Sequence, residues 1–554
     1  MSTLLSAETT GPFAKGWRNT DSLRRVFLPS CTTILFFAME QVPDSMEVEE
    51  LLQQVQEASS GKKELVEKYL LLMTTHPQTF LFSNPGQTRK DLIQLYRDSL
   101  AGPLKALNIK IKMAGVLAHL DKLDYKQFVL GFSCVVYGFE QYLNYRQYTR
   151  YLMPKRPSEL ADIVTEEDFK KAQLYNLDKA RFGFIEGIYK QVESVLMLHY
   201  DALPKIWDFA GELLFKATGY GTDYEILQSL VFLALFTLIS TVTAMPFNLY
   251  STFVVEEKHG FNKQTLGLFF ADILKSQVIM AVLMFPFMSA FLWIIKSTGD
   301  KFYFYVWLIV IVFQLFIITV YPTFIQPMFN KLTPMEEGEL RTQIEALAAR
   351  IDFPLKKLYI IDGSKRSGHS NAYFYGFGKN KHIVLYDTLI EHSNNDEICA
   401  VLAHELGHWK MGHTLKLLAV NQVYLLSIFW LFSFFINNKQ LYQDFGFYTM
   451  PTLIGFLLFQ FIYSPVDSVI GFLQHMYQRK NEYEADAYAL KLGYASTLRS
   501  ALIKLSVKNL GGFNVDPWYS AWNHSHPSLV ERLKAIGVKP TSDKPIVVED
   551  KKEL

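Results

Sequence analysis

Few cysteines and no excess of charge narrow the classes to which this chain of 554 residues can belong. Its three cysteines, Cys31, Cys134 and Cys399, lie far apart, so they form no Cys-x-x-Cys metal or redox motif and imply no disulfide framework. Any metal site must therefore be built from histidine and carboxylate side chains. The formal net charge is only +1 and no basic face is evident, which argues against nucleic acid as a partner.

Hydrophobic residues make up 50% of the chain and aromatic residues 15%, and both concentrate in long blocks. This pattern is typical of a polytopic membrane protein, in which each span needs roughly 20 apolar residues to cross the bilayer core. The segment 191–214 is the weakest candidate because Glu193, His199, Asp201 and Asp208 interrupt it, so a surface or re-entrant helix is the alternative there. The seven predicted spans are 128–145, 191–214, 226–246, 278–295, 302–320, 417–436 and 447–469.

Four charged residues lie within or beside these spans: Glu140, Asp272, Lys275 and Asp467. Each would be costly if it faced lipid, so we expect them to face one another, the interior of the bundle, or water. Structural pairing explains each of them at least as well as a functional role does.

Basic residues near the ends of the spans predict the orientation in the membrane. Arg146 and Arg150 follow the first span, Lys258 follows the third, and Arg479 follows the last. If these ends are cytosolic, segment 326–416 and the C-terminal tail are cytosolic as well. The last four residues, Lys-Lys-Glu-Leu, resemble a dilysine retrieval signal, so we expect a multi-pass protein of the endoplasmic reticulum membrane, with the inner nuclear membrane as a further location.

The first 122 residues form an extension to which no function can be assigned. They are mostly polar, contain no motif that carries chemistry, and lack a convincing signal-peptide cleavage pattern. Met113 opens a stretch that could itself begin a membrane protein. The residues before it are therefore either an accessory extension or no part of the natural product.

The run Ala-His-Glu-Leu-Gly-His at residues 403–408 carries the clearest chemistry. On a helix, His404 and His408 project from one face and can hold one zinc ion, while Glu405 lies beside them as a general base. Catalytic zinc usually has three protein ligands, but Met411 and Thr414 occupy the positions where one extended form of this motif needs Gly and His.

A third ligand is available on the helical stretch after the last span. Glu482 and Asp486 share one face of that helix, so Glu482 can complete the metal site and Asp486 can orient a ligand imidazole. His413 is one residue out of register and is not expected to be a ligand. Taken alone, an acidic helix face is more often simply solvated, and Glu484 is expected to be such a solvated residue.

Five segments together resemble the type I CAAX prenyl endopeptidases, which are seven-span zinc metallopeptidases of the gluzincin type. The resemblance covers nearly everything from about residue 123 to about residue 537. Five motifs in the right order around matching spans are specific, where one alone would be weak. The segments are His-Glu-Leu-Gly-His-Trp at 404–409, Glu-Tyr-Glu-Ala-Asp at 482–486, His-Ser-His-Pro at 524–527, Glu-Glu-Lys-His-Gly-Phe-Asn at 256–262 and Ser-Asn-Ala-Tyr-Phe-Tyr-Gly at 370–376.

The resemblance implies roles for individual residues. One Zn²⁺ per chain would be held by His404, His408 and Glu482, with Glu405 as general base and acid. His526 would steady the oxyanion, and segment 371–375 would be an edge strand that pairs with the substrate backbone. The remaining implied site residues are Asp486, which supports a ligand, Arg532, which helps to frame the site, and Asn371, Ala372 and Tyr373, which bind substrate.

The expected fold is mainly α, with about seven transmembrane helices enclosing a chamber and a cytosolic zinc-metallopeptidase domain that carries a small β-sheet. The expected activity is removal of the last three residues from farnesylated or geranylgeranylated CAAX proteins at the lipid bilayer, with a further upstream cut in some precursors. A quality-control peptidase for unprenylated or stalled chains is the alternative, and an inactive membrane scaffold fits less well. The predicted divisions are 1–122, 123–325, 326–416, 417–473, 474–540 and 541–554.

Overall fold

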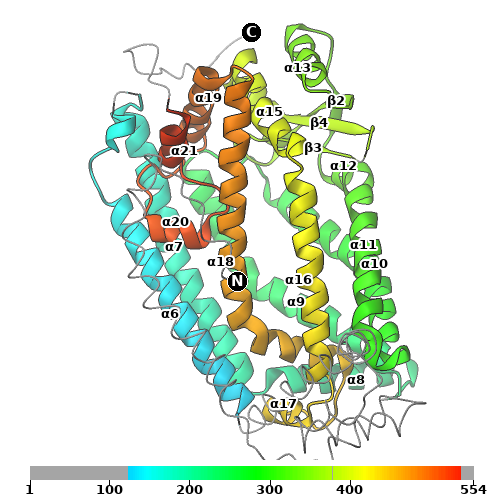
Figure 1. The fold of residues 1–554 in the computed structure, drawn as a ribbon. Helices are drawn as coiled ribbons and strands as arrows, with labels where there is room; N and C mark the ends of the chain where they lie inside the picture. The colour runs from blue at the N-terminus through cyan, green and yellow to red at the C-terminus, as the bar shows by residue number, and fades with distance from the viewer. Residues whose placement is uncertain (1–122, 162, 222, 377, 538–554) are drawn as a thin grey trace, which may run out of the picture. The chain divides into compact units, whose positions relative to one another are not determined.

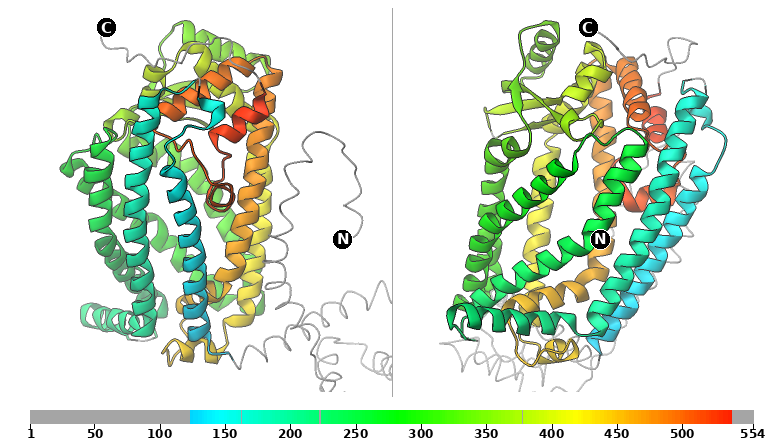
Figure 2. Two further views of the ribbon diagram at one scale, coloured as in Figure 1. Left: turned by 90° about the vertical axis from the view of Figure 1, so that its left-hand side faces the viewer. Right: turned by 180° about the vertical axis from the view of Figure 1, so that it is seen from behind.

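The computed structural model describes residues 123–161, 163–221, 223–376 and 378–537, and Figures 1 and 2 show their arrangement. The N-terminal extension and the dilysine-like end lie outside these residues. Seven helices of 19 residues or more run along the described part and form a bundle (Figure 1). They are α6 (Tyr125–Tyr151), α7 (Glu166–His199), α9 (Glu225–Tyr250), α10 (Leu266–Ser297), α11 (Phe302–Val320), α16 (His413–Phe435) and α18 (Thr452–Lys491).

Five of the seven, α9, α10, α11, α16 and α18, are long and apolar enough to cross a membrane by length and composition. They contain or closely overlap the predicted spans 226–246, 278–295, 302–320, 417–436 and 447–469, although α18 begins at Thr452, after Pro451. Helix α6 contains the predicted span 128–145 and runs beside α7 in both figures. The mainly helical membrane fold is therefore as predicted.

The predicted span 191–214 is wrong as a single helix. Helix α7 ends at His199, and Asp201 takes a left-handed conformation with φ of 51°, after which α8 (Ala202–Thr218) runs across the end of the bundle in Figure 2. The second long helix is α7, whose 34 residues include many charged side chains. A search for apolar runs passes over such a helix, because its polar residues lower the average hydropathy.

Three of the four charged residues named in or beside the spans, Asp272, Lys275 and Asp467, have polar partners, as expected. Asp272 on α10 accepts hydrogen bonds from Nε and Nη2 of Arg366 at 2.8 and 3.0 Å, and Lys275 lies 4.0 Å from the same carboxylate. Asp467 on α18 accepts a hydrogen bond from the hydroxyl of Tyr424 on α16. These contacts join helices to one another and to the segment before the zinc motif, which supports a structural role for the charges.

A small four-stranded sheet lies at one end of the bundle (Figure 1). Its strands are β1 (Leu332–Pro334), β2 (Leu355–Ile361), β3 (Ala372–Tyr375) and β4 (Lys381–Tyr386), in the order β1-β2-β4-β3. Strand β4 is parallel to β2 and antiparallel to β3, with Ala372 opposite Leu385 and Tyr375 opposite His382. Strand β3 therefore lies at an edge of the sheet, as predicted for segment 371–375.

Helices α13 (Glu339–Arg350) and α15 (Asn395–Lys410) pack with the sheet around a common apolar core that includes Ile344, Ile383 and Leu402. Helix α15 carries the His-Glu-x-x-His motif. The remaining short helices are α12 (Gln326–Phe329), α14 (Asp387–His392), α17 (Lys439–Asp444), α19 (Ala495–Lys508), α20 (Pro517–Asn523) and α21 (Leu529–Ile536).

The N-terminus of α15 is determined by local sequence and then attached to α19. Asn394 accepts a hydrogen bond from the backbone of Glu397, and the Glu397 carboxylate accepts one from the backbone of Asn394, which forms a capping box. The buried Glu397 carboxylate also accepts 2.8 Å hydrogen bonds from Ser500 and Lys504 on α19. The start of the motif helix is thus held at both its backbone and its side chains.

Candidate active site

Gly407 allows the two helices that carry the predicted ligands to approach each other closely. A Cβ atom at this position would lie 3.2 Å from Cβ of Tyr488 and 3.3 Å from Cα of Ala485, both on α18. A larger residue would therefore push α15 away from α18. The glycine between the two histidines thus determines how near they come to Glu482.

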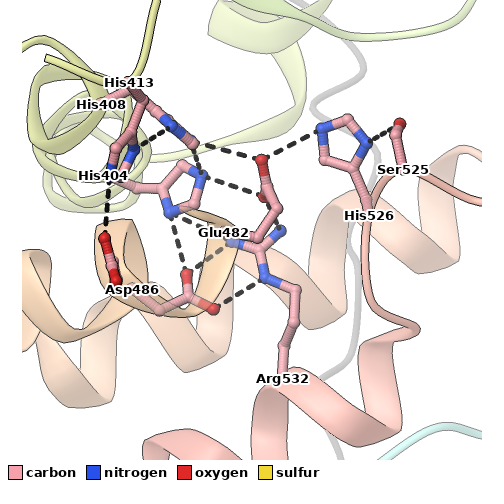
Figure 3. Close-up of polar contacts among 9 residues, drawn as sticks. His404, His408, His413, Glu482, Asp486, Ser525, His526 and Arg532 are labelled. Atoms are coloured by element: carbon pink, nitrogen blue, oxygen red, sulfur yellow. Dashed lines mark hydrogen bonds and ion pairs between the residues drawn. The ribbon is translucent and has the colours of Figure 1, made fainter. Parts of the chain in front are cut away.

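His404 and His408 on α15 and Glu482 on α18 form a cluster in which one ligand atom of each residue lies within 4.8 Å of the others (Figure 3). The two Nε2 atoms are 3.3 Å apart, and the Glu482 carboxylate lies 3.4 Å from His404 Nε2 and 3.3 Å from His408 Nε2. Oε2 of Glu482 is buried and has no hydrogen-bond partner among the described residues. Such a cluster of buried lone pairs fits a divalent metal ion, which would satisfy all three groups.

Asp486 and Arg532 determine which nitrogen of His404 is available for a metal. His404 Nδ1 lies 2.9 Å from Oδ1 of Asp486, and Arg532 donates to the same carboxylate at 2.6 and 2.9 Å (Figure 3). With Nδ1 donating to Asp486, Nε2 presents its lone pair toward Glu482. Burial alone lowers the pKa of His404, but the nearby carboxylates of Asp486 and Glu482 outweigh it and raise that pKa.

A second chain of contacts lies behind His408. Its Nδ1 is 3.0 Å from Nδ1 of His413, and Nε2 of His413 is 3.0 Å from Oε2 of Glu484. His413 is 1% exposed and is the first residue of α16, reached through Gly412 with φ of 68°. The exclusion of His413 as a ligand is consistent with this position, whereas the expectation that Glu484 is merely solvated is wrong, because it pairs with His413.

Glu405 and His526 line one small cavity together with the predicted ligands His404 and Glu482. Its volume is about 130 Å³, and its charged and polar lining comes from α15, α18, α21, the segment before β3 and the loop before α21. Nε2 of His526 is 3.3 Å from Glu482, and its side chain is 67% exposed. The predicted site residues that line this cavity are Asn371, Ala372, His404, Glu405, Glu482, His526 and Arg532.

Tyr373 lies apart from this cavity. Because successive side chains of a strand point to opposite faces, Tyr373 points away from the face that buries Ala372. Its hydroxyl accepts a hydrogen bond from Gln326, its ring contacts that of Tyr386, and burial raises its pKa to about 12. Only the backbone of Tyr373 is therefore in a position to pair with a peptide at the edge of β3.

The motif at 256–262 supports the loop that leads into β3. Gly368 donates a backbone hydrogen bond to the carbonyl of Phe261 at 3.0 Å, and the rings of Phe261 and His369 stack with centroids 4.0 Å apart. Glu256 lies 3.6 Å from His369 and accepts a 2.8 Å hydrogen bond from Tyr175 on α7. The charged helix α7 thus helps to position the strand beside the metal-ligand cluster.

Arg479 joins α18 to the C-terminal segment, a structural role that sequence reasoning missed because it counted Arg479 only as a basic charge. It is 7% exposed and donates hydrogen bonds to Ser520 at 2.8 Å, to the carbonyl of His526 at 3.2 Å and to Glu531 at 2.9 Å. These contacts hold the C-terminal loop over the end of α18. No local pattern identifies this role, because the partners lie 41 to 52 residues away.

Two family descriptions match adjacent parts of the chain. "CAAX prenyl protease N-terminal, five membrane helices" matches residues 144–331, and "Peptidase family M48" matches residues 334–538. The CAAX prenyl protease 1 homolog of Homo sapiens is 45% identical over 449 residues, covering 74% of this chain and 94% of its own. The CAAX prenyl protease 1 of Saccharomyces cerevisiae is 41% identical over 439 residues, covering 76% and 97%. The crystal structure of S. mikatae Ste24p aligns with a TM-score of 0.71 and 40% identity, covering 75% of this chain and 99% of the other.

Proposed function

This chain belongs to the CAAX prenyl protease family of M48 peptidases, and from that membership we propose that it is a zinc-dependent endopeptidase that removes the last three residues of prenylated CAAX proteins. It is a multi-pass membrane metalloprotease by the same relationship. The observation that carries the finer proposal is the cluster of His404, His408 and Glu482, of which His404 and Glu482 line one cavity with Glu405 and His526.

Two imidazoles and one carboxylate are the donor set of many catalytic zinc sites, which leave a position for water or substrate. The mutually facing Nε2 atoms and the unpartnered oxygen of Glu482 support the assignment of these three side chains as ligands. When bound, zinc supplies a Lewis acid that polarises the scissile carbonyl and activates water. Asp486 and His413 hold the two imidazoles from behind, which keeps the ligand nitrogens directed toward one another.

The remaining chemistry belongs to groups that move or stabilise charge. We assign Glu405 as the base that accepts a proton from the attacking water and later delivers it to the leaving amine. His526 is assigned to donate a hydrogen bond where negative charge develops on the carbonyl oxygen, a contribution of roughly 3–4 kcal/mol in comparable sites. Both side chains line the ligand cavity, and the 67% exposure of His526 leaves its ring accessible to a peptide.

The bilayer fits a substrate that is itself attached to lipid. A farnesyl or geranylgeranyl chain anchors the CAAX protein, so its scissile bond stays near the membrane surface. Within the most apolar windows of the spans that include α9 and α11, only 6% of the residues are buried by protein. These apolar residues are therefore free to face lipid acyl chains or an internal chamber.

We further infer that the catalytic end of the bundle faces the cytosol. Arg479 donates to the carbonyl of His526 beside the catalytic cavity, Lys258 lies in the motif that supports the loop into β3, and Arg150 lies in the last turn of α6. Basic residues concentrate on the cytosolic side of membrane proteins. Prenylated proteins carry their anchor on that side. The dilysine-like C-terminal sequence adds support for residence in the endoplasmic reticulum membrane.

The decisive experiment compares cleavage of matched peptides by the purified full-length protein. A farnesylated CAAX peptide should be cut after its modified cysteine and release a tripeptide, and the unprenylated peptide should be cut more slowly. A zinc chelator should abolish both activities, and added Zn²⁺ should restore them.

The same assay separates the alternatives. Equal rates on the two peptides would favour a quality-control peptidase for unprenylated chains. No cleavage of either peptide by zinc-loaded protein would favour an inactive scaffold, although the complete set of ligand and base residues argues against that outcome.

A further inference from the structure

A second cavity, of about 970 Å³, lies where the fifth span meets the sheet. Its walls are the end of α11, the π-helical turn η6 (Tyr321–Ile325), α12, and residues of β1, β2, β4 and the end of β3. It shares no lining residue with the catalytic cavity. Its volume falls at the upper end of the range found for ligand-binding pockets.

One wall of this cavity is basic. Four lysines line it, Lys331, Lys356, Lys357 and Lys365, and no carboxylate in the described part of the chain lies within 4.0 Å of their ammonium groups. The one acidic side chain in the lining is Asp362, and its Oδ1 accepts hydrogen bonds from the backbone of Lys331 at 2.8 Å and from Asn330 at 3.0 Å. The lining thus carries three more positive than negative charges, which attracts a polyanion.

The opposite wall is apolar and continues the surface of the span. Ile318 and Met328 line the cavity and are 42% and 52% exposed, and the adjacent Tyr321 and Phe324 are 53% and 67% exposed. The candidate span that includes α11 extends to Phe329, so these side chains lie at the end of a membrane-crossing segment. Exposed apolar residues there face acyl chains, and tyrosines are typical of the membrane interface.

At the back of the cavity lies a buried polar group without a partner. His382 is 9% exposed, its ring stacks on Tyr375 with centroids 4.9 Å apart, and its Nδ1 has no hydrogen-bond partner among the described residues. Burial and the nearby charge of Lys357 both lower the pKa of His382, so the ring is neutral at pH 7. A neutral imidazole suits a hydroxyl group better than a second charge.

We propose that this cavity binds the headgroup of a multiply charged anionic phospholipid of the phosphoinositide class, drawn from the leaflet at the catalytic end of the bundle. The lysines would bind its phosphates, His382 would lie near its ring hydroxyls, and its acyl chains would follow the apolar wall along α11. A net excess of three positive charges suits a headgroup with several phosphates better than one with a single phosphodiester.

The occupant would also contact the strand proposed to hold the substrate. Tyr375, the last residue of β3, and Gly376 line this cavity, whereas Ala372, the first residue of β3, lines the catalytic one. A bound headgroup would therefore fix the height of that strand relative to the bilayer. This consequence rests on the proposed peptidase function, but the binding itself does not.

The test is a titration of the purified full-length protein in detergent with micelles that contain fluorescent phosphatidylinositol 4,5-bisphosphate. The variant K331Q/K356Q/K357Q should bind on the order of a hundredfold more weakly, from about fivefold per lysine. The matched control K170Q/K263Q/K491Q changes three exposed lysines outside the cavity and should bind like the unaltered protein.

Two results would overturn the proposal. One is that both triple variants bind the phosphatidylinositol 4,5-bisphosphate micelles equally weakly. The other is that phosphatidylserine at the same total charge competes for binding as well as unlabelled phosphatidylinositol 4,5-bisphosphate does. Either result would indicate diffuse attraction to a basic surface. Cleavage of a detergent-solubilised farnesyl peptide should be retained by both triple variants, which shows that they are folded. Because the titration requires no cleavage, a failed titration would leave the proposed peptidase activity standing.

Discussion

Replacing Asp486 with asparagine tests whether the support behind His404 determines metal affinity. The substitution keeps the shape of the side chain but removes its charge, so the 2.9 Å contact with His404 and the two contacts with Arg532 lose most of their electrostatic strength. Removal of a partner behind a metal-binding histidine typically weakens metal binding 10- to 100-fold. We therefore expect Asp486→Asn to lower zinc affinity by about 1.4–2.7 kcal/mol.

The same substitution has a second cost that must be separated from the first. The side chains of Asp486 and Arg532 are 3% and 13% exposed, so the variant leaves a nearly buried guanidinium whose remaining carboxylate contact is Glu482 at 3.8 Å. Breaking a buried ion pair on one side typically costs 3–5 kcal/mol of stability. The double variant D486N/R532Q removes both charges and should recover much of this loss.

Zinc affinity is measured by competition with a chromophoric chelator, and stability by thermal unfolding of the metal-free protein. We expect the double variant to regain thermal stability while its zinc affinity stays low, because His404 still lacks its charged partner. If Asp486→Asn binds zinc within twofold of the unaltered protein, the positioning role is refuted. If both properties recover together in the double variant, the effect on zinc is a consequence of misfolding alone.

Three further predictions concern the same site. Glu405→Gln should keep zinc but lower the cleavage rate at least 10²- to 10⁴-fold, as expected for loss of a general base, whereas Glu482→Ala should lose zinc, and metal analysis of the purified variants distinguishes the two. His413→Ala should weaken zinc binding 10- to 100-fold, and Glu484→Gln should weaken it by less. If chelator competition finds the zinc affinity of both variants unchanged, neither residue supports His408. The pKa of His404 is raised above 6.5, so zinc occupancy should fall as the pH drops through that raised pKa. The metal-free protein should instead lose the stability contributed by protonated His404 as the pH rises through the same pKa. A pH series of zinc binding and of thermal unfolding measures both effects.

Much of the site is predictable from residue spacing. The four-residue spacing of His404 and His408 places them on one helix face, and the same spacing puts Glu482 and Asp486 on one face of α18. The five most apolar spans were likewise found from composition, because the cost of crossing a bilayer depends mainly on the average polarity of about 20 consecutive residues. These features depend on neighbours along the chain.

Contacts between distant segments escape the same reasoning. Nothing near Glu484 in sequence shows that it reaches His413, 71 residues earlier, or that Arg479 holds the loop of His526, 47 residues later. Helix α7 was missed because average hydropathy does not detect a charged helix that packs against other helices. Segment 191–214 was wrongly predicted as one helix because average hydropathy does not detect the break at Asp201 between α7 and α8. Such features depend on packing.

The sequence alone predicted the metal-ligand motif, the candidate base Glu405 and the membrane character, since each arises from residue types at helical or span-length spacing. Only the tertiary structure decided which partners lie behind the ligands, that Tyr373 faces away from the catalytic cavity, and that four lysines gather beside an apolar wall at the end of α11. The physical reason is that hydrogen bonds, ion pairs and cavities form between side chains that folding brings within a few ångströms, whatever their separation along the chain.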